Sequence, residues 1–138
     1  MMNLDELLSE LVERKGSDLF VTVGSPPTLK VNGHLVSLGG EALDKKGALT
    51  LVRDTLSSDH FERYIRTKEA NYAIYREALG RFRVSAFWQQ ELPGMVIRRI
   101  ETRIPTFEDL QLPNILQEVA MAKRGLVLFV GATGAGKS

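Results

Sequence analysis

A glycine-rich stretch near the end of the chain has the residue types and spacing of a phosphate-binding loop. It consists of Gly131, Ala132, Thr133, Gly134, Ala135, Gly136, Lys137 and Ser138, which match G-x-x-x-x-G-K-[ST] at every fixed position. The glycines allow the backbone to turn so that its N–H groups surround phosphate oxygens. We expect Lys137 to reach the β and γ phosphates of ATP, and the hydroxyl of Ser138 to bind the Mg²⁺ that bridges them.

The residues before this loop support that interpretation. Residues 126–130 are continuously apolar, which predicts a strand buried on both faces of a parallel sheet. A strand in that position is the context that the loop requires, so a chance match of a glycine-rich turn is the weaker alternative. The helix that would complete the anion site is not within the 138 residues, and neither is an acidic strand end or a base. We therefore expect this chain alone to bind ATP weakly or not at all and not to hydrolyse it.

The first hundred residues carry the patterns of an α+β domain with a mixed or antiparallel sheet. Leucines at helical spacing follow Asn3, a predicted N-cap with Glu6 three residues later. The hydrophobic periodicity and turn residues predict further elements. They are strands at 19–23, 28–31, 34–38, 71–75, 81–90 and 95–100, helices at 49–56 and from 57 or 58 to 65, a hairpin turn at Asn32-Gly33 and another turn at 92–94.

Two arginines in the predicted sheet are candidates for contacting an anion. If strands 81–90 and 95–100 form an antiparallel hairpin, Arg83 and Arg98 lie on one face of the sheet. Like charges placed side by side repel each other unless an anion joins them. The alternative is a solvated basic face or ordinary surface ion pairs.

Other residues that could do chemistry have simpler interpretations. Alternation along the strand places Phe82 and Trp88 toward the core rather than on a platform for stacking nucleobases. We expect Asp18 to cap a turn rather than act as a catalytic carboxylate. His34 and His60 lie far apart in a chain without cysteine, so the spacing favours no metal site built on them.

Charge and hydropathy limit the classes of partner that the chain can bind. The net charge is +1 with acids and bases mixed along the chain, which disfavours nucleic acid as a partner. No segment is apolar for long enough to cross a bilayer, and the start of the chain does not resemble a signal peptide. We expect a cytoplasmic protein without direct membrane insertion.

Several motifs, in this order, resemble those of one family. They are residues 16–19 (Gly-Ser-Asp-Leu), 24–27 (Gly-Ser-Pro-Pro), 31–33 (Val-Asn-Gly), 80–87 (Gly-Arg-Phe-Arg-Val-Ser-Ala-Phe) and 124–138. Together they resemble the PilT/PilU group of type IV pilus retraction ATPases over essentially the entire chain. Residues 96–101 and 129–134, and Phe20 in place of a histidine, are more similar to the PilU-like branch.

The resemblance implies an architecture. It implies a PAS-like domain at 1–103, a linker with short helices at 104–124, and at 125–138 the first strand and loop of a RecA-like ATPase domain. In the linker, Thr106 with Asp109 and then Pro113 predict a capped turn and a short helix.

The resemblance also implies an activity. The parent protein would be a hexameric ATPase that powers pilus retraction and twitching motility. ATP would sit between domains, with Arg83 and Arg98 as arginine-finger-like groups from a neighbouring subunit. A PilT-like partner ATPase and an inner-membrane platform protein are the implied partners, at the cytoplasmic side of the inner membrane. The alternatives are a non-catalytic accessory or oligomerisation module and a P-loop ring ATPase that remodels nucleic acid.

Overall fold

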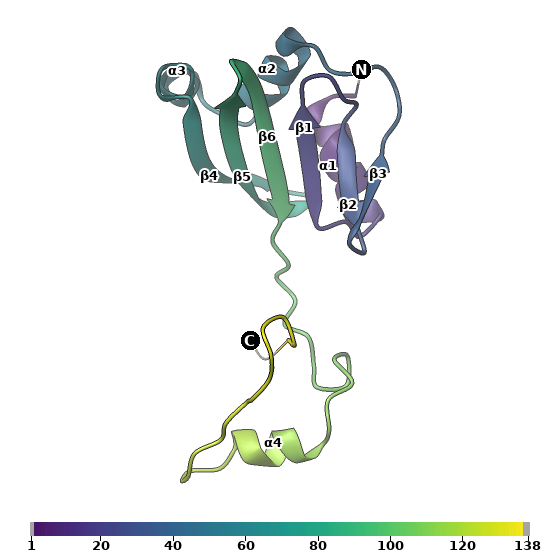
Figure 1. Cartoon of the computed structure of the whole chain (residues 1–138), viewed down its shortest axis with the longest axis vertical. Coiled ribbons are helices and arrows are strands. Elements are labelled where there is room, and N and C mark those ends of the chain that lie inside the picture. The colour runs from purple at the N-terminus through teal and green to yellow at the C-terminus, as the bar shows by residue number, and fades with distance from the viewer. Residues whose placement is uncertain (1, 137–138) are drawn as a thin grey trace. The chain divides into compact units, whose positions relative to one another are not determined.

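The chain divides into two units, Met1–Glu101 and Thr102–Ser138. The computed structural model describes residues 2–136 (Figure 1). The first unit holds all the strands and three of the helices, and the second holds one short helix among the described residues. The predicted α+β class is correct for the first unit.

The first unit is built on a six-stranded sheet in the order β3-β2-β1-β6-β5-β4. Its strands are β1 (Asp18–Thr22), β2 (Thr28–Val31), β3 (His34–Ser37), β4 (Glu69–Arg76), β5 (Gly80–Gln89) and β6 (Leu92–Arg99). Every neighbouring pair is antiparallel, so the sheet is antiparallel rather than mixed. The β2–β3 turn is at Asn32 and Gly33, as predicted, with φ of 50° and 79°. Left-handed values at both positions are what a tight two-residue hairpin requires.

The first unit contains three helices, and in the view of Figure 1 the first of them, α1, lies behind β1 and β2. The helices are α1 (Leu4–Glu13), α2 (Lys45–Arg53) and α3 (Ser58–Thr67). The predicted capping box of α1 is present, because Asn3 Oδ1 accepts from the Glu6 N–H at 2.9 Å and Glu6 Oε2 accepts from the Asn3 N–H at 2.9 Å. Asp44 caps α2 in a similar way, with its carboxylate accepting from the Gly47 N–H.

The core lies between the helices and one face of the sheet. It is formed by Leu7, Leu8 and Leu11 of α1, Leu51 and Val52 of α2, Tyr64 of α3, and the alternate strand residues Leu19, Val21, Leu29, Phe82, Val84, Met95 and Ile97. The opposite face of the sheet carries the intervening, mostly polar residues. This alternation leaves an open face on which charged side chains can gather.

The predicted turn at 92–94 is wrong. The β5–β6 hairpin turns at Gln90 and Glu91, whose φ values are 50° and 61°, and Pro93 and Gly94 lie inside β6. Proline is tolerated there for a geometric reason. Trp88 of β5 lies opposite Pro93, and its N–H donates to the Lys68 carbonyl next to β4, away from β6. The nitrogen of Pro93 therefore points away from β5 and toward β1. Because the pairing of β1 with β6 ends at Gly94, the missing N–H of Pro93 leaves no ladder hydrogen bond unmade.

In the second unit, the predicted short helix is present as α4 (Ile115–Ala120). Thr106 and Asp109 cap a turn as predicted, because each backbone N–H donates to the other's side chain, at 2.9 and 3.1 Å. The predicted strand at 126–130 is absent, and its side chains are between 50% and 91% exposed. A strand exists only through hydrogen bonds to a neighbour, and no described residue pairs with this segment.

Candidate functional site

The open face of the sheet carries a row of charged residues from neighbouring strands. The registers place Lys30 of β2 opposite Asp18 of β1, Asp18 opposite Arg98 of β6, and Arg98 opposite Arg83 of β5. On the far side of Arg83 lies Ala73 of the edge strand β4. The hypothesis that Arg83 and Arg98 share one face is therefore confirmed, and they are direct cross-strand neighbours.

Arg98 is held by an ion pair that the sequence patterns do not predict. Its Nε donates to Asp18 Oδ1 at 2.9 Å, and the Ser17 hydroxyl donates to Asp18 Oδ2 at 2.8 Å. The Asp18 side chain is 6% exposed, whereas the Arg98 side chain is 72% exposed. Asp18 thus anchors one edge of the guanidinium, and the terminal nitrogens of Arg98 remain at the surface.

The electrostatics of Asp18 follow from this geometry. Burial alone would raise the pKa of its carboxyl. Two effects outweigh burial, namely the hydrogen bonds from Arg98 and Ser17 and the positive charges of Arg98 and Lys30. Together they hold the pKa of Asp18 below its ordinary value. Asp18 is therefore ionised at neutral pH. Its expected role as a turn cap was wrong, because Asp18 is the first residue of β1 and faces Arg98 across the ladder.

Arg83 differs from Arg98 in having no partner. Its side chain is exposed and makes no hydrogen bond or ion pair with residues 2–136. The row therefore holds three cations, Lys30, Arg83 and Arg98, against the single carboxylate of Asp18. An anion that reached both guanidinium groups would relieve their mutual repulsion.

The glycine-rich loop lies in the second unit, and part of it can be described. Gly134 and Gly136 have φ of 80° and 87°, which other residues rarely adopt. The Ala135 N–H donates to the Ala132 carbonyl at 3.1 Å, so this donor is used within the turn. Lys137 and Ser138 lie outside the described residues, so their predicted contacts with phosphate and Mg²⁺ stay predictions.

The predicted core position of Phe82 is confirmed, since the residue is 0% exposed. Trp88 is half-buried, and the Lys68 ammonium lies 3.8 Å from the centroid of its ring. A lysine over the indole face occupies the surface on which a nucleobase would stack.

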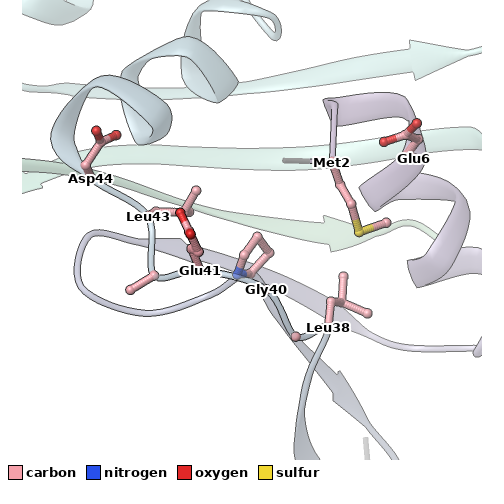
Figure 2. Close-up of a pocket in the computed structure, with 10 residues that line it drawn as sticks. Met2, Glu6, Leu38, Gly40, Glu41, Leu43 and Asp44 are labelled. Carbon is pink, nitrogen blue, oxygen red and sulfur yellow. The ribbon is translucent and has the colours of Figure 1, made fainter.

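A separate hollow of about 860 Å³ opens between the start of α1 and the loop that precedes α2 (Figure 2). Its walls include Met2, Leu38 and Leu43, and two of its carboxylates, those of Glu6 and Asp44, already cap helices. This hollow contains neither arginine of the charged row. No cluster of metal-ligating side chains occurs among residues 2–136, and none of the helices there is long and apolar enough to cross a membrane.

Comparison with curated proteins gives relatives over nearly the whole chain. The type IV pilus ATPase PilU of Pseudomonas aeruginosa is 48% identical over 137 residues, which are 99% of this chain and 36% of PilU. The type IV pilus retraction ATPase PilT of the same organism is 31% identical over 137 residues, again 99% of this chain, and 40% of PilT. No protein-family model matches the chain.

Solved structures agree in fold. The crystal structure of the pilus retraction motor PilT with bound ADP superposes with a TM-score of 0.75 at 27% identity and covers 99% of this chain and 40% of that one. The antiparallel sheet and its helices match the N-terminal part of that structure. The chain thus spans only 36–40% of the length of these relatives.

Proposed function

Because this chain belongs to the PilT/PilU family of type IV pilus ATPases, we propose that it is the N-terminal part of an ATP-hydrolysing motor that powers pilus retraction and twitching motility. The observation that carries the proposal is the match of residues 131–138 to the phosphate-binding pattern at every fixed position. The PilT motor of similar fold was crystallised with ADP, which supports a nucleotide as the ligand.

In this proposal the glycine-rich loop binds ATP once the residues that follow it are present. Backbone N–H groups of the loop donate to the phosphates once the turn that now engages the Ala135 N–H has opened, and the ammonium of Lys137 neutralises the β and γ phosphates. Ser138 would hold Mg²⁺, which supplies charge neutralisation on the transferred phosphoryl group. Residues 125–138 then belong to a RecA-like domain, joined through a linker at 104–124 to a PAS-like domain at 1–103.

The charged row on the open sheet face supplies the second half of the proposed site. Arg83 and Arg98 contact the phosphates of a nucleotide bound to a neighbouring subunit of a hexamer. The geometry supports this role because Arg83 is unpaired within residues 2–136 and the terminal nitrogens of Arg98 are exposed. Positive groups aimed at the phosphoryl oxygens stabilise the charge that develops during transfer.

A second candidate is an accessory subunit that acts beside a PilT-like partner ATPase. The observation that favours it is the higher identity to PilU, 48%, than to PilT, 31%. In both candidates the protein works on the cytoplasmic side of the inner membrane, against a platform protein of the pilus machine.

The experiment uses the full-length protein that contains this chain. Nucleotide affinity and phosphate release are measured for the native protein and for Lys137→Ala, Arg83→Gln and Arg98→Gln. We expect Lys137→Ala to abolish nucleotide binding. The arginine variants should retain binding and lose about 10³-fold or more in kcat, the effect of removing an arginine finger.

The outcomes separate the candidates. Nucleotide binding with hydrolysis only in the presence of a partner ATPase would favour the accessory subunit. If the native full-length protein binds no nucleotide, the motor proposal is rejected. For the 138-residue chain alone, calorimetric titration with Mg-ATP should give no heat of binding at micromolar affinity.

A further inference from the structure

A groove lies between α2 and α3. It encloses about 510 Å³ and is lined by Lys45, Lys46, Leu49, Thr50, Arg53 and Phe61. The lining thus combines three cationic side chains with two apolar ones and contains no carboxylate. This composition differs from that of the whole chain, in which 18 basic residues are balanced by 17 acidic ones.

The cations of the groove lack carboxylate partners within residues 2–136. Lys45 and Arg53 lie against aromatic rings instead, with the Lys45 ammonium 5.3 Å from the Trp88 centroid and the Arg53 guanidinium 5.8 Å from the Phe61 centroid. Two acids are next to these cations in sequence. Asp44 uses its carboxylate to cap α2, and Asp54, which follows Arg53, forms no ion pair with it among residues 2–136. A contact with a ring face leaves most N–H donors of an ammonium or guanidinium group available for hydrogen bonds to a carboxylate. The groove therefore retains capacity for an acidic ligand.

The spacing of the lining residues fits a helical ligand. Lys45, Leu49 and Arg53 follow one another at i, i+4 intervals, so they form a stripe along one side of α2. The side chains of Leu49 and Phe61 are half-buried and contribute the apolar part of the lining. Half-buried apolar side chains bordered by cations suit the apolar face of an amphipathic helix with acidic flanks.

We propose that this groove is a docking site for an acidic amphipathic helix of a partner protein. The helix buries an apolar side chain against Leu49 and Phe61, and its carboxylates bind Lys45, Lys46 and Arg53. An anionic lipid surface is the less suitable ligand, because a bilayer is entered by apolar side chains that project from the surface, whereas Leu49 and Phe61 are half-buried. The inference is independent of nucleotide binding, since it rests on the first unit alone.

Trp88 is the only tryptophan of the chain and provides an internal reporter. The Lys45 ammonium lies against the Trp88 ring. If a carboxylate of the ligand draws this ammonium away, we expect the fluorescence of Trp88 to change. The probe is a capped helical peptide of alanine, leucine and glutamate, with leucines at i, i+4 spacing and glutamates beside them. The 138-residue chain is titrated with this peptide at physiological salt, and again with peptides in which glutamines replace the glutamates or alanines replace the leucines.

We expect micromolar affinity for the acidic peptide and at least tenfold weaker binding of both control peptides. In the protein, Lys45→Gln with Arg53→Gln should weaken binding at least tenfold, and Leu49→Gln should weaken it about fivefold. Lys15→Gln removes a charge at the end of α1 and should leave binding unchanged. Circular dichroism and urea unfolding establish that each variant is folded.

Three results would overturn the proposal. The first is equal affinity for the acidic and glutamine peptides, and the second is an equal loss of binding in Lys15→Gln and in the groove variants. The third is tighter binding to phosphatidylserine vesicles than to the peptide, with the same dependence on Lys45 and Arg53, which would assign the groove to a membrane surface.

Discussion

Replacing Arg98 by glutamine removes the guanidinium that pairs with Asp18, whose side chain is only 6% exposed. The Ser17 hydroxyl still donates to the Asp18 carboxylate, but the strongest compensation for its burial is lost. A buried carboxylate without its cation destabilises the folded state relative to the unfolded chain, in which water solvates the charge. We therefore expect Arg98→Gln to lower the free energy of unfolding at neutral pH.

The magnitude follows from the exposure of the two groups. Unit charges about 4 Å apart interact by about 1 kcal/mol in bulk water and by about 4 kcal/mol at an effective dielectric constant of about 20. The Arg98 side chain is 72% exposed, so solvent screens the pair and the value lies toward the lower limit. We expect a coupling free energy between Asp18 and Arg98 of about 1–1.5 kcal/mol from the double-mutant cycle with Asp18→Asn.

The pH dependence has a defined sign. The pKa of Asp18 in the folded protein is below its ordinary value, so the ion pair stabilises the fold above about pH 4, the pKa of an unfolded aspartate. This stabilisation disappears as the pH falls through the lower pKa of the folded state. The difference between the native protein and Arg98→Gln should therefore be largest at pH 7 and shrink in acid.

Urea unfolding followed by Trp88 fluorescence measures these free energies between pH 3 and pH 7. Arg14→Gln is the control, because it breaks a surface ion pair between Glu10 and the C-cap residue of α1 and should cost only about 0.3–0.5 kcal/mol. A coupling free energy below the control value, or one that does not change with pH, would refute the assignment of Asp18 as the ionised partner of Arg98.

Further expectations concern the core and the hairpins, and each is measured by urea unfolding. Leu7→Ala leaves a cavity at a residue that is 0% exposed, and should cost about 2–5 kcal/mol; a loss below about 1 kcal/mol would contradict the packing of α1 on the sheet. Gly94→Ala places a methyl group 2.9 Å from the Phe87 ring and should cost about 1–3 kcal/mol. Gln90→Asn with Glu91→Gly should stabilise the β5–β6 hairpin by about 1 kcal/mol, because both positions have positive φ; unchanged stability would exclude strain at this turn.

Local patterns predicted most of the first unit. The α1 cap, the Asn32-Gly33 turn and the strand at 28–31 follow from residue types within a few positions of each other, so the sequence alone was sufficient. The β5–β6 turn was misplaced because Pro93 and Gly94 are the usual turn residues, whereas Gln90 and Glu91 carry no such signal. Long-range pairing decided this case, because the nitrogen of Pro93 faces β1 at a position where the pairing of β1 with β6 has already ended.

The charged row was predicted only in part, for a related reason. Alternation placed Arg83 and Arg98 on one face, but the partner of Arg98 comes from β1, a strand 80 residues earlier in the chain. Which strands are neighbours depends on the packing of the whole sheet. Once β1 is extended by one residue to include Asp18, the same alternation would have placed its carboxylate beside Arg98, so the missing information was the strand order.

The exposed apolar segment at 126–130 has a practical consequence for handling the chain by itself. Its side chains, which are 50–91% exposed, form a β-prone sequence without charge or proline. Such segments stack with copies of themselves into intermolecular cross-β assemblies, and the flanking Lys123 and Arg124 act as electrostatic gatekeepers. High salt should therefore hasten precipitation of the isolated chain, and dilute, low-salt buffer should keep it dispersed.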